Sequence, residues 1–132
     1  MSVGILLVTH EGLGQAFRDN AEATWPVDLP ASIGVFEVAR DRDMELSRGQ
    51  ALALIDSLDS GEGVLALIDV GGATPFNIVQ SLLGPRFMMV TGLNFAMLMR
   101  SLTYAHLPIE QVAEKAAEGA IREVAIYPEE TV

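Results

Sequence analysis

The sequence contains no cysteine and only two histidines, His10 and His106. The lack of cysteine excludes disulfide bonds and thiolate metal sites. The two histidines stand far apart in the chain, without the spacing that zinc or iron sites show in a sequence. We therefore expect no bound metal ion and no other cofactor.

Positive charge is also scarce. Eight lysines and arginines stand against 18 aspartates and glutamates, which gives a formal net charge of −10 and an isoelectric point near 4.4. Binding to a phosphate backbone or to an anionic membrane surface requires a basic surface. We therefore expect no nucleic-acid partner. The acidity either serves solubility alone or favours a basic partner protein.

Long hydrophobic runs are missing too, although half of the residues are hydrophobic. A membrane-spanning helix needs about 20 consecutive apolar residues, and the apolar runs here are far shorter. The N-terminal segment also lacks the basic region and the cleavage site of a secretion signal. We therefore expect a soluble, cytoplasmic protein without membrane insertion, and the 132 residues fit one domain.

Short apolar runs alternate with amphipathic stretches along the chain. The apolar runs predict strands over residues 4–10, 32–38, 64–69 and 86–91. The amphipathic stretches predict helices over residues 13–25, 44–58, 75–83, 94–102 and 109–123. This alternation is typical of a single doubly wound α/β domain, with a mostly parallel sheet of four strands and helices on both faces. A last apolar run over residues 124–127 predicts a short edge strand, which pairs with its own sheet or with that of another subunit.

Polar side chains follow three of the expected strands where each strand ends. His10 ends the first strand, Asp69 and Thr74 follow the third, and Thr91 and Asn94 follow the fourth. In open α/β sheets, ligands bind at this carboxyl edge. We therefore expect these five side chains to converge if their strands are neighbours.

A carboxylate beside a histidine fixes the tautomer of the ring and leaves the second nitrogen as a nucleophile. Asp69 can do this for His10, and no serine or cysteine stands beside the histidine to act as an acyl-transfer nucleophile. His10 is then the expected nucleophile, and a phosphoryl group is the group that we expect it to accept. The N-terminus of the helix over residues 13–25 lies close enough to help hold such an anion. Further backbone N–H groups and a hydroxyl come from the loop residues Gly72, Ala73 and Thr74.

Three other interpretations compete with this one. The glycine-rich loop after the third strand suggests a nucleotide site, but neither dinucleotide nor P-loop spacing occurs. A response-regulator receiver has a similar topology, but it would have an acidic pair where this chain has Thr9-His10. The third interpretation is structural, with Asp69 and Asn94 as helix caps. Thr74 likewise suits the N-cap of the helix over residues 75–83, and His106 is expected to be a surface or packing residue.

Three motifs in order resemble one family over nearly the whole chain. They are Thr9-His10 at the end of an apolar strand, Asp69-Val70-Gly71-Gly72-Ala73-Thr74-Pro75-Phe76-Asn77, and Thr91-Gly92-Leu93-Asn94. The sequence is similar in these motifs to the mannose/fructose-type IIA components of the bacterial phosphoenolpyruvate-dependent sugar phosphotransferase system. Residues 1–132 would then form a single IIA domain.

The resemblance implies that His10 accepts a phosphoryl group from the phosphohistidine of HPr and passes it to a IIB component or a regulatory acceptor. Asp69 would orient the imidazole, while Gly72, Ala73, Thr74, Thr91 and Asn94 would bind or support the phosphate. It also implies a homodimer in which the C-terminal strand crosses to the partner, and it is compatible with association with a membrane permease complex.

Two alternatives stay open at this point. The phosphotransfer subunit of dihydroxyacetone kinase resembles the family around the histidine but serves a nucleotide-bearing partner. A non-catalytic module that binds an anion or a partner loop would use the same edge. Glu11 also departs from the family pattern, which more often has glycine after the histidine, and it adds negative charge beside the site.

Overall fold

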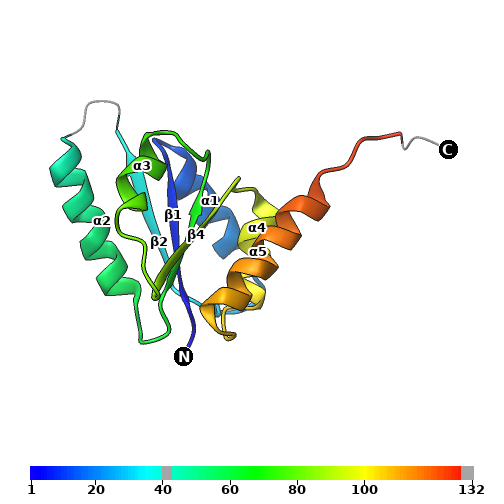
Figure 1. Cartoon of the computed structure of the whole chain (residues 1–132). Helices are drawn as coiled ribbons and strands as arrows, with labels where there is room; N and C mark the ends of the chain where they lie inside the picture. The colour runs from blue at the N-terminus through cyan, green and yellow to red at the C-terminus, as the bar shows by residue number, and fades with distance from the viewer. Residues whose placement is uncertain (40–42, 129–132) are drawn as a thin grey trace.

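A computed structural model describes residues 1–39 and 43–128 (Figure 1). The four strands are β1 (Gly4–His10), β2 (Ile33–Val38), β3 (Val64–Ile68) and β4 (Phe87–Thr91). The five helices are α1 (Leu13–Thr24), α2 (Met44–Leu58), α3 (Thr74–Gln80), α4 (Phe95–Thr103) and α5 (Ile109–Glu123). Strands and helices therefore alternate as the sequence predicts, with differences of a few residues at their ends.

The strands form one parallel sheet in the order β2-β1-β3-β4. Ile5 of β1 pairs with Ile33 of β2 on one side and with Leu65 of β3 on the other. Leu65 in turn pairs with Met88 of β4. The four-stranded parallel sheet with helices on both faces is confirmed, and β1 and β3 are neighbours at its centre.

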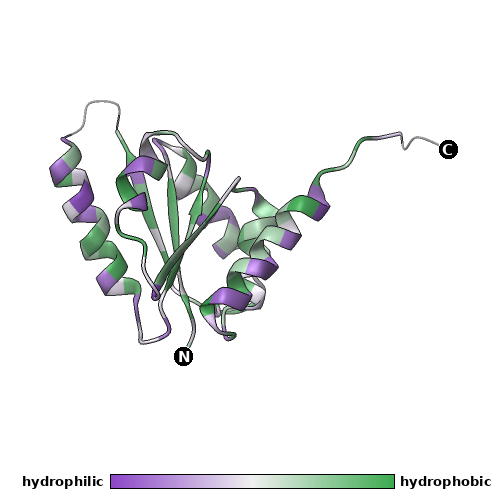
Figure 2. Ribbon diagram, viewed as in Figure 1, coloured by the Kyte–Doolittle hydropathy of each residue, from purple (hydrophilic) through white to green (hydrophobic). Residues whose placement is uncertain are grey.

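Alternate residues of the strands face two separate cores. Ile5 and Leu7 of β1 pack with α1, α4 and α5, whereas Leu6 and Val8 pack with α2 and α3. Figure 1 shows the two groups of helices on opposite faces of the sheet, and Figure 2 shows the hydrophobic strands between them. Because both faces are covered, the central strands have to be apolar throughout, which is why they are the clearest feature of the sequence.

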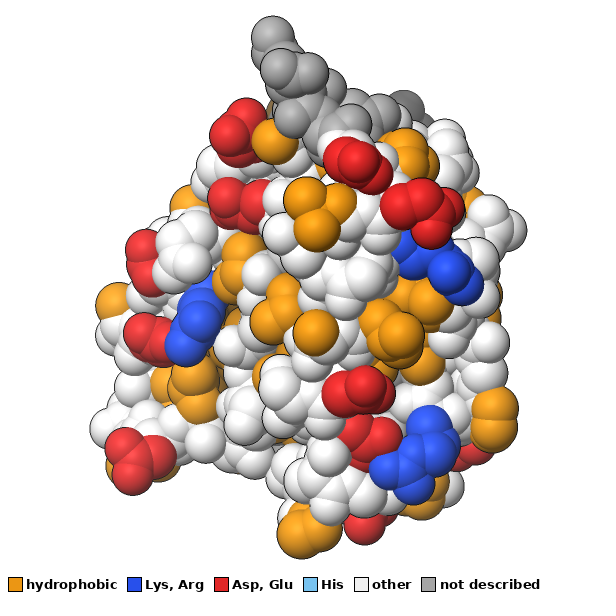
Figure 3. Space-filling view, turned by 90° about the vertical axis from the view of Figure 1, so that its left-hand side faces the viewer, with side chains coloured by type: hydrophobic (Ala, Val, Ile, Leu, Met, Phe, Trp, Pro, Cys, Tyr) orange, Lys and Arg blue, Asp and Glu red, His pale blue; other side chains and the backbone are white. Residues whose placement is uncertain are grey.

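Helix α2 is the least amphipathic of the long helices. Only Ser47, Ala51 and Ile55 are buried in it, while Leu46 and Leu52 are exposed. The face of the molecule on this side carries apolar side chains scattered among charged ones (Figure 3). The helix packs on the sheet through Ala51 and Ile55, with Leu54 and Leu58 partly buried beside them. Leu46 and Leu52 lie outside this contact, although they are part of the same hydrophobic pattern. Nowhere in the described ranges is there a helix with the length and apolar character to cross a membrane.

The edge strand expected over residues 124–127 does not form within this chain. The segment is extended and leaves the body of the molecule after α5 (Figure 1). Val124, Ile126 and Tyr127 are each about four-fifths exposed. None of the four strands in residues 1–39 and 43–128 pairs with this segment.

Candidate active site

His10 and Asp69 meet at the carboxyl end of the two central strands. Val8 pairs with Ile68 in the β1–β3 ladder, so the chain brings position 10 and position 69 together just beyond it. The backbone N–H of His10 donates to Asp69 Oδ2 at 2.9 Å, and the ring Nδ1 lies 2.7 Å from the same oxygen. The predicted histidine–carboxylate pair is therefore present in the structure.

Asp69 is held as a carboxylate. Burial raises its pKa, but hydrogen bonds from the backbone and ring of His10, the backbone N–H of Val70 and the charge of His10 outweigh that effect. The net pKa of Asp69 lies below its ordinary value. Its Oδ1 accepts from Val70 at 2.8 Å, so both carboxylate oxygens have donors. An ionised acceptor at Nδ1 places the ring proton on that nitrogen.

The second ring nitrogen, Nε2, is then the one with the lone pair. The side chain of His10 is 53% exposed, whereas that of Asp69 is only 9% exposed. A shallow pocket of about 480 Å³ opens beside the ring and is lined by His10, Glu11, Gly12 and Val38. The arrangement presents a nucleophilic nitrogen to a large incoming group and keeps its orienting carboxylate out of water.

The loop from Asp69 to Thr74 lies beside the end of β4. A side chain at Gly71 would come within 3.3 Å of Thr91 Cγ2, so glycine allows the loop to approach Thr91. Gly72 has φ +81°, a conformation that other residues rarely adopt. Ala73 is the N-cap residue of α3, and Thr74 is the first residue of that helix. The predicted capping role of Thr74 is therefore wrong by one position, because the helix begins one residue earlier than expected.

Asn94 serves as a structural cap. Its Oδ1 accepts from the backbone N–H of Met97 at 2.9 Å, and its Nδ2 donates to the carbonyl of Ala120 at 3.2 Å. The backbone N–H of Leu93 also donates to Ile68 at 2.9 Å, which ties the loop before α4 to β3. Both polar atoms of the Asn94 side chain are thus engaged within the protein, and they fix α4 against α5.

The N-terminus of α1 is already occupied in part. Gly14 N–H donates to Thr9 Oγ1 at 2.9 Å, and Gln15 N–H donates to Glu37 Oε2 at 2.8 Å. These two amides are therefore engaged within the protein, and the expectation that the N-terminus of α1 helps hold an anion beside His10 stays a prediction for the remaining N–H groups of its first turn. Sequence reasoning gave neither Thr9 nor Glu37 a role, although one acidic residue within an apolar strand was a visible signal.

A comparison of the sequence with known protein families identifies a family for this chain. Residues 4–117 match the model of the family described as "PTS system fructose IIA component", where PTS is the phosphotransferase system. The chain belongs to this family. Members are phosphoryl carriers of the phosphotransferase system, and the match includes both His10 and Asp69.

Solved IIA structures have the same fold. The mannose/sorbose-specific IIA subunit from Enterococcus faecalis has a TM-score of 0.84 and 18% identity, with 100% of this chain and 99% of that chain covered. An EIIA component from Streptococcus agalactiae gives 0.79 and 18%, with 95% and 97% covered. The PTS IIA protein associated with the fucose utilization operon of Streptococcus pneumoniae gives 0.73 and 21%, with 89% and 93% covered. No curated protein matches the chain.

The second histidine of this IIA chain, His106, lies far from the pair of His10 and Asp69. His106 is exposed at the amino end of the sheet, next to the residue whose carbonyl accepts from Val3. No hydrogen bond joins its side chain to the rest of residues 1–39 and 43–128. Nor do those residues contain a group of three or more histidine, aspartate or glutamate side chains suited to a metal ion.

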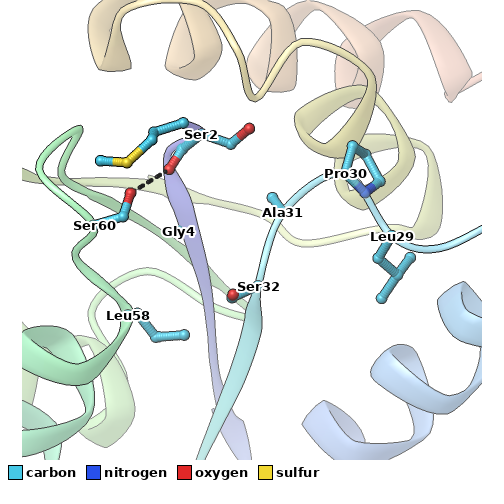
Figure 4. A pocket seen from close by; sticks show the side chains of 9 residues that line it. Ser2, Gly4, Leu29, Pro30, Ala31, Ser32, Leu58 and Ser60 are labelled. Atoms are coloured by element: carbon cyan, nitrogen blue, oxygen red, sulfur yellow. Dashed lines mark hydrogen bonds between the residues drawn. The ribbon is translucent and has the colours of Figure 1, made fainter.

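A second pocket, of about 370 Å³, also lies at the amino end (Figure 4). Serines and apolar residues line it, including Ser32, Leu29 and Leu58. The hydroxyl of Ser60 donates to the carbonyl of Ser2 at 3.1 Å across its rim. None of the lining side chains is ionisable, so the pocket has no counterpart of the histidine–carboxylate pair.

Proposed function

We propose that this IIA protein carries a phosphoryl group on Nε2 of His10, taken from the phosphohistidine of HPr and passed to a IIB component. The observation that carries the proposal is the 2.7 Å contact between Nδ1 and Asp69 Oδ2 on a ring that is half exposed. This contact fixes the tautomer and leaves Nε2 directed toward a partner.

The transfer is an in-line displacement between two histidines. The lone pair of Nε2 attacks the phosphorus of phospho-HPr, and a new N–P bond forms as the donor's N–P bond breaks. The electron pair of the broken bond returns to the ring nitrogen of the donor. The proton on Nδ1 stays hydrogen-bonded to Asp69, which stabilises the positive charge that develops on the ring.

The loop after β3 is proposed to receive the phosphoryl oxygens. Gly72, Ala73 and Thr74 lead into the N-terminus of α3, where backbone N–H groups favour an anion. Thr91 approaches the same loop through Gly71. We assign Asn94 a supporting role, because its hydrogen bonds hold the start of α4 in place.

The proposed partners are HPr as donor and a IIB component, or a regulatory protein, as acceptor. Such exchange takes place in the cytoplasm, with the IIB component associated with a membrane permease complex. Only phosphoryl-transfer proteins contact the IIA chain in this scheme, so the sugar is selected elsewhere.

The test is phosphorylation by phosphoenolpyruvate, Enzyme I and HPr. We expect an acid-labile phosphate on the wild type and on His106→Ala, and none on His10→Ala. An unlabelled wild type in the presence of labelled HPr, or a labelled His10→Ala, would overturn the assignment. Passage of the label to a nucleotide-bearing dihydroxyacetone kinase subunit, and not to a IIB component, would support the alternative acceptor.

We also propose a homodimer that the C-terminal segment completes. Val124, Ile126 and Tyr127 are an exposed apolar set, and β4 pairs with β3 alone within the described chain. An extended apolar segment and an unpaired strand edge are complementary. Truncation before Val124 should therefore convert a dimer to a monomer in light scattering, and a dimer of unchanged size would contradict this.

A further inference from the structure

Thr9 is a buried polar residue directly before the proposed phosphoryl acceptor. Its exposed fraction is 0%. The hydroxyl donates to the carbonyl of His10 at 2.8 Å and accepts from the backbone N–H of Gly14 at 2.9 Å. A buried hydroxyl is stable only when it is hydrogen-bonded, and this one uses both a donor and an acceptor bond.

These two bonds close the turn that carries the site. Glu11 and Gly12 lie between β1 and α1, and Gly12 has φ +90°, so the chain reverses sharply there. The Thr9 hydroxyl joins His10, the last residue of β1, to Gly14 in the first turn of α1. The β1–α1 junction is therefore fixed by one side chain as well as by the strand ladder.

The position of the His10 backbone determines the geometry of the ring. Asp69 Oδ2 accepts from the backbone N–H of His10 at 2.9 Å and is also the partner of the ring Nδ1. The carbonyl of the same residue is held by Thr9. Side chains thus hold both backbone polar groups of His10, and a shift of the backbone would change the distance from the ring to the carboxylate.

We propose that Thr9 is a positioning residue for phosphoryl transfer, acting through the backbone of His10. The inference rests on the proposed function, since it concerns the same ring. A valine would fill nearly the same volume, so packing alone does not require the hydroxyl at this position. What the hydroxyl adds is a fixed His10 carbonyl and a partner for a buried Gly14 N–H.

The kinetic test compares Thr9→Val with Thr9→Ser in transfer from phospho-HPr. Thr9→Val should lower the rate constant at saturating phospho-HPr by about 10- to 100-fold, because a small misplacement of a reacting group has effects of this size. The HPr concentration at half-maximal rate should not change. Thr9→Ser keeps the hydroxyl and should transfer within about twofold of the wild type.

Ser101→Ala provides a matched control. Ser101 is also 0% exposed, and its hydroxyl donates to the carbonyl of Met97 at 2.8 Å, inside α4 and away from His10. Its removal should lower Tm without changing the transfer rate. A folded Thr9→Val that transfers like the wild type, or a Thr9→Ser as slow as Thr9→Val, would overturn the proposal.

A second measurement does not depend on phosphorylation. Imidazole ¹⁵N shifts of His10 in the unphosphorylated protein report its tautomer and the Nδ1–Asp69 hydrogen bond. We expect these ¹⁵N chemical shifts to change in Thr9→Val and to remain those of the wild type in Thr9→Ser and Ser101→Ala. Unchanged shifts in Thr9→Val would refute the positioning role even if HPr is not the donor, while altered shifts without any transfer in the wild type would refute only the proposed function. Should Thr9→Val not fold, Thr9→Ala replaces it, with the same outcomes expected.

Discussion

The two ends of the sheet each hold an aspartate whose pKa lies below its ordinary value, but the two carboxylates have different partners. At the carboxyl end, Asp69 holds the backbone and ring of His10. At the amino end, Asp59 accepts from the Arg86 guanidinium at 2.6 and 3.1 Å and from two backbone N–H groups. The Arg86 hydrogen bond is the main reason that the pKa of Asp59 is low.

The partner decides what each carboxylate can do. Arginine remains protonated and has only donors, so Arg86 has no lone pair with which to attack a substrate. A histidine oriented through one nitrogen still presents the other. A lowered carboxylate pKa therefore does not distinguish a reactive site from a structural ion pair, whereas the identity and exposure of its partner do.

The largest effect on the transfer rate is expected from removal of the Asp69 carboxylate, and removal of the Asp59 carboxylate provides the comparison. We expect Asp69→Asn to slow transfer from phospho-HPr by roughly 10- to 100-fold, the range seen when a side chain that orients a functional histidine is changed. Asp59→Asn should leave the rate unchanged and lower Tm, because it weakens a loop far from His10. Rapid-quench kinetics and thermal melts measure the two quantities. Equal rates in both variants would remove Asp69 from the mechanism.

Acid should abolish the contribution of Asp69 to stability. Its pKa in the folded protein is below the ordinary value of 3.8, so the folded state binds fewer protons than the unfolded state. The stabilisation is complete above the ordinary value and is lost as pH falls through the lowered one. The free energy of unfolding of the wild type minus that of Asp69→Asn, measured by denaturant titration from neutral into acid pH, should therefore shrink. A difference that grew in acid would contradict this sign.

A smaller effect is expected at Glu37 of β2, whose carboxylate accepts from the backbone N–H of Gln15 in the first turn of α1. Removal of a cap that accepts a backbone N–H costs about 1 kcal/mol, so Glu37→Ala should lower the free energy of unfolding by about that amount. Its effect on transfer should be smaller than that of Asp69→Asn. Glu22→Ala is the control, because Glu22 forms only an exposed pair with Arg18 within α1, and such pairs contribute little.

The smallest effect belongs to the amino-end pocket. Ser60→Ala removes the hydrogen bond across its rim to the carbonyl of Ser2. We expect labelling and transfer rates equal to those of the wild type, since no group there takes part in the reaction. A clear loss of transfer in this variant would show that the two ends of the sheet are coupled.

Much of the site could be predicted because it depends on local patterns. The apolar runs marked the strands, and the polar residues directly after them had to lie at one edge of a parallel sheet. That reasoning found His10 and Asp69. It did not find Thr9 and Glu37, whose bonds to the first turn of α1 depend on how closely that helix approaches β2, and Gly14 permits this approach.

The sequence could not predict features that depend on which surfaces come into contact in the folded protein. The pattern of α2 could not show that Leu46 and Leu52 remain in solvent, because helical periodicity gives a direction and not the width of the contact. Nor could the apolar run over residues 124–127 show that it pairs with none of the four strands in the described part of its own chain. A strand needs a second strand, and its hydrogen bonds are satisfied only by the edge that the fold brings to it.

The sequence by itself determined the alternation of strands and helices, the burial of the central strands and the placement of polar groups at the carboxyl edge, since these follow from residue order and from the polarity of each side chain. Only the tertiary structure decided that β1 and β3 are neighbours and that Asp69 therefore reaches the His10 ring. Strand order is a property of long-range packing, and the 2.7 Å contact that defines the site exists only once that order is set.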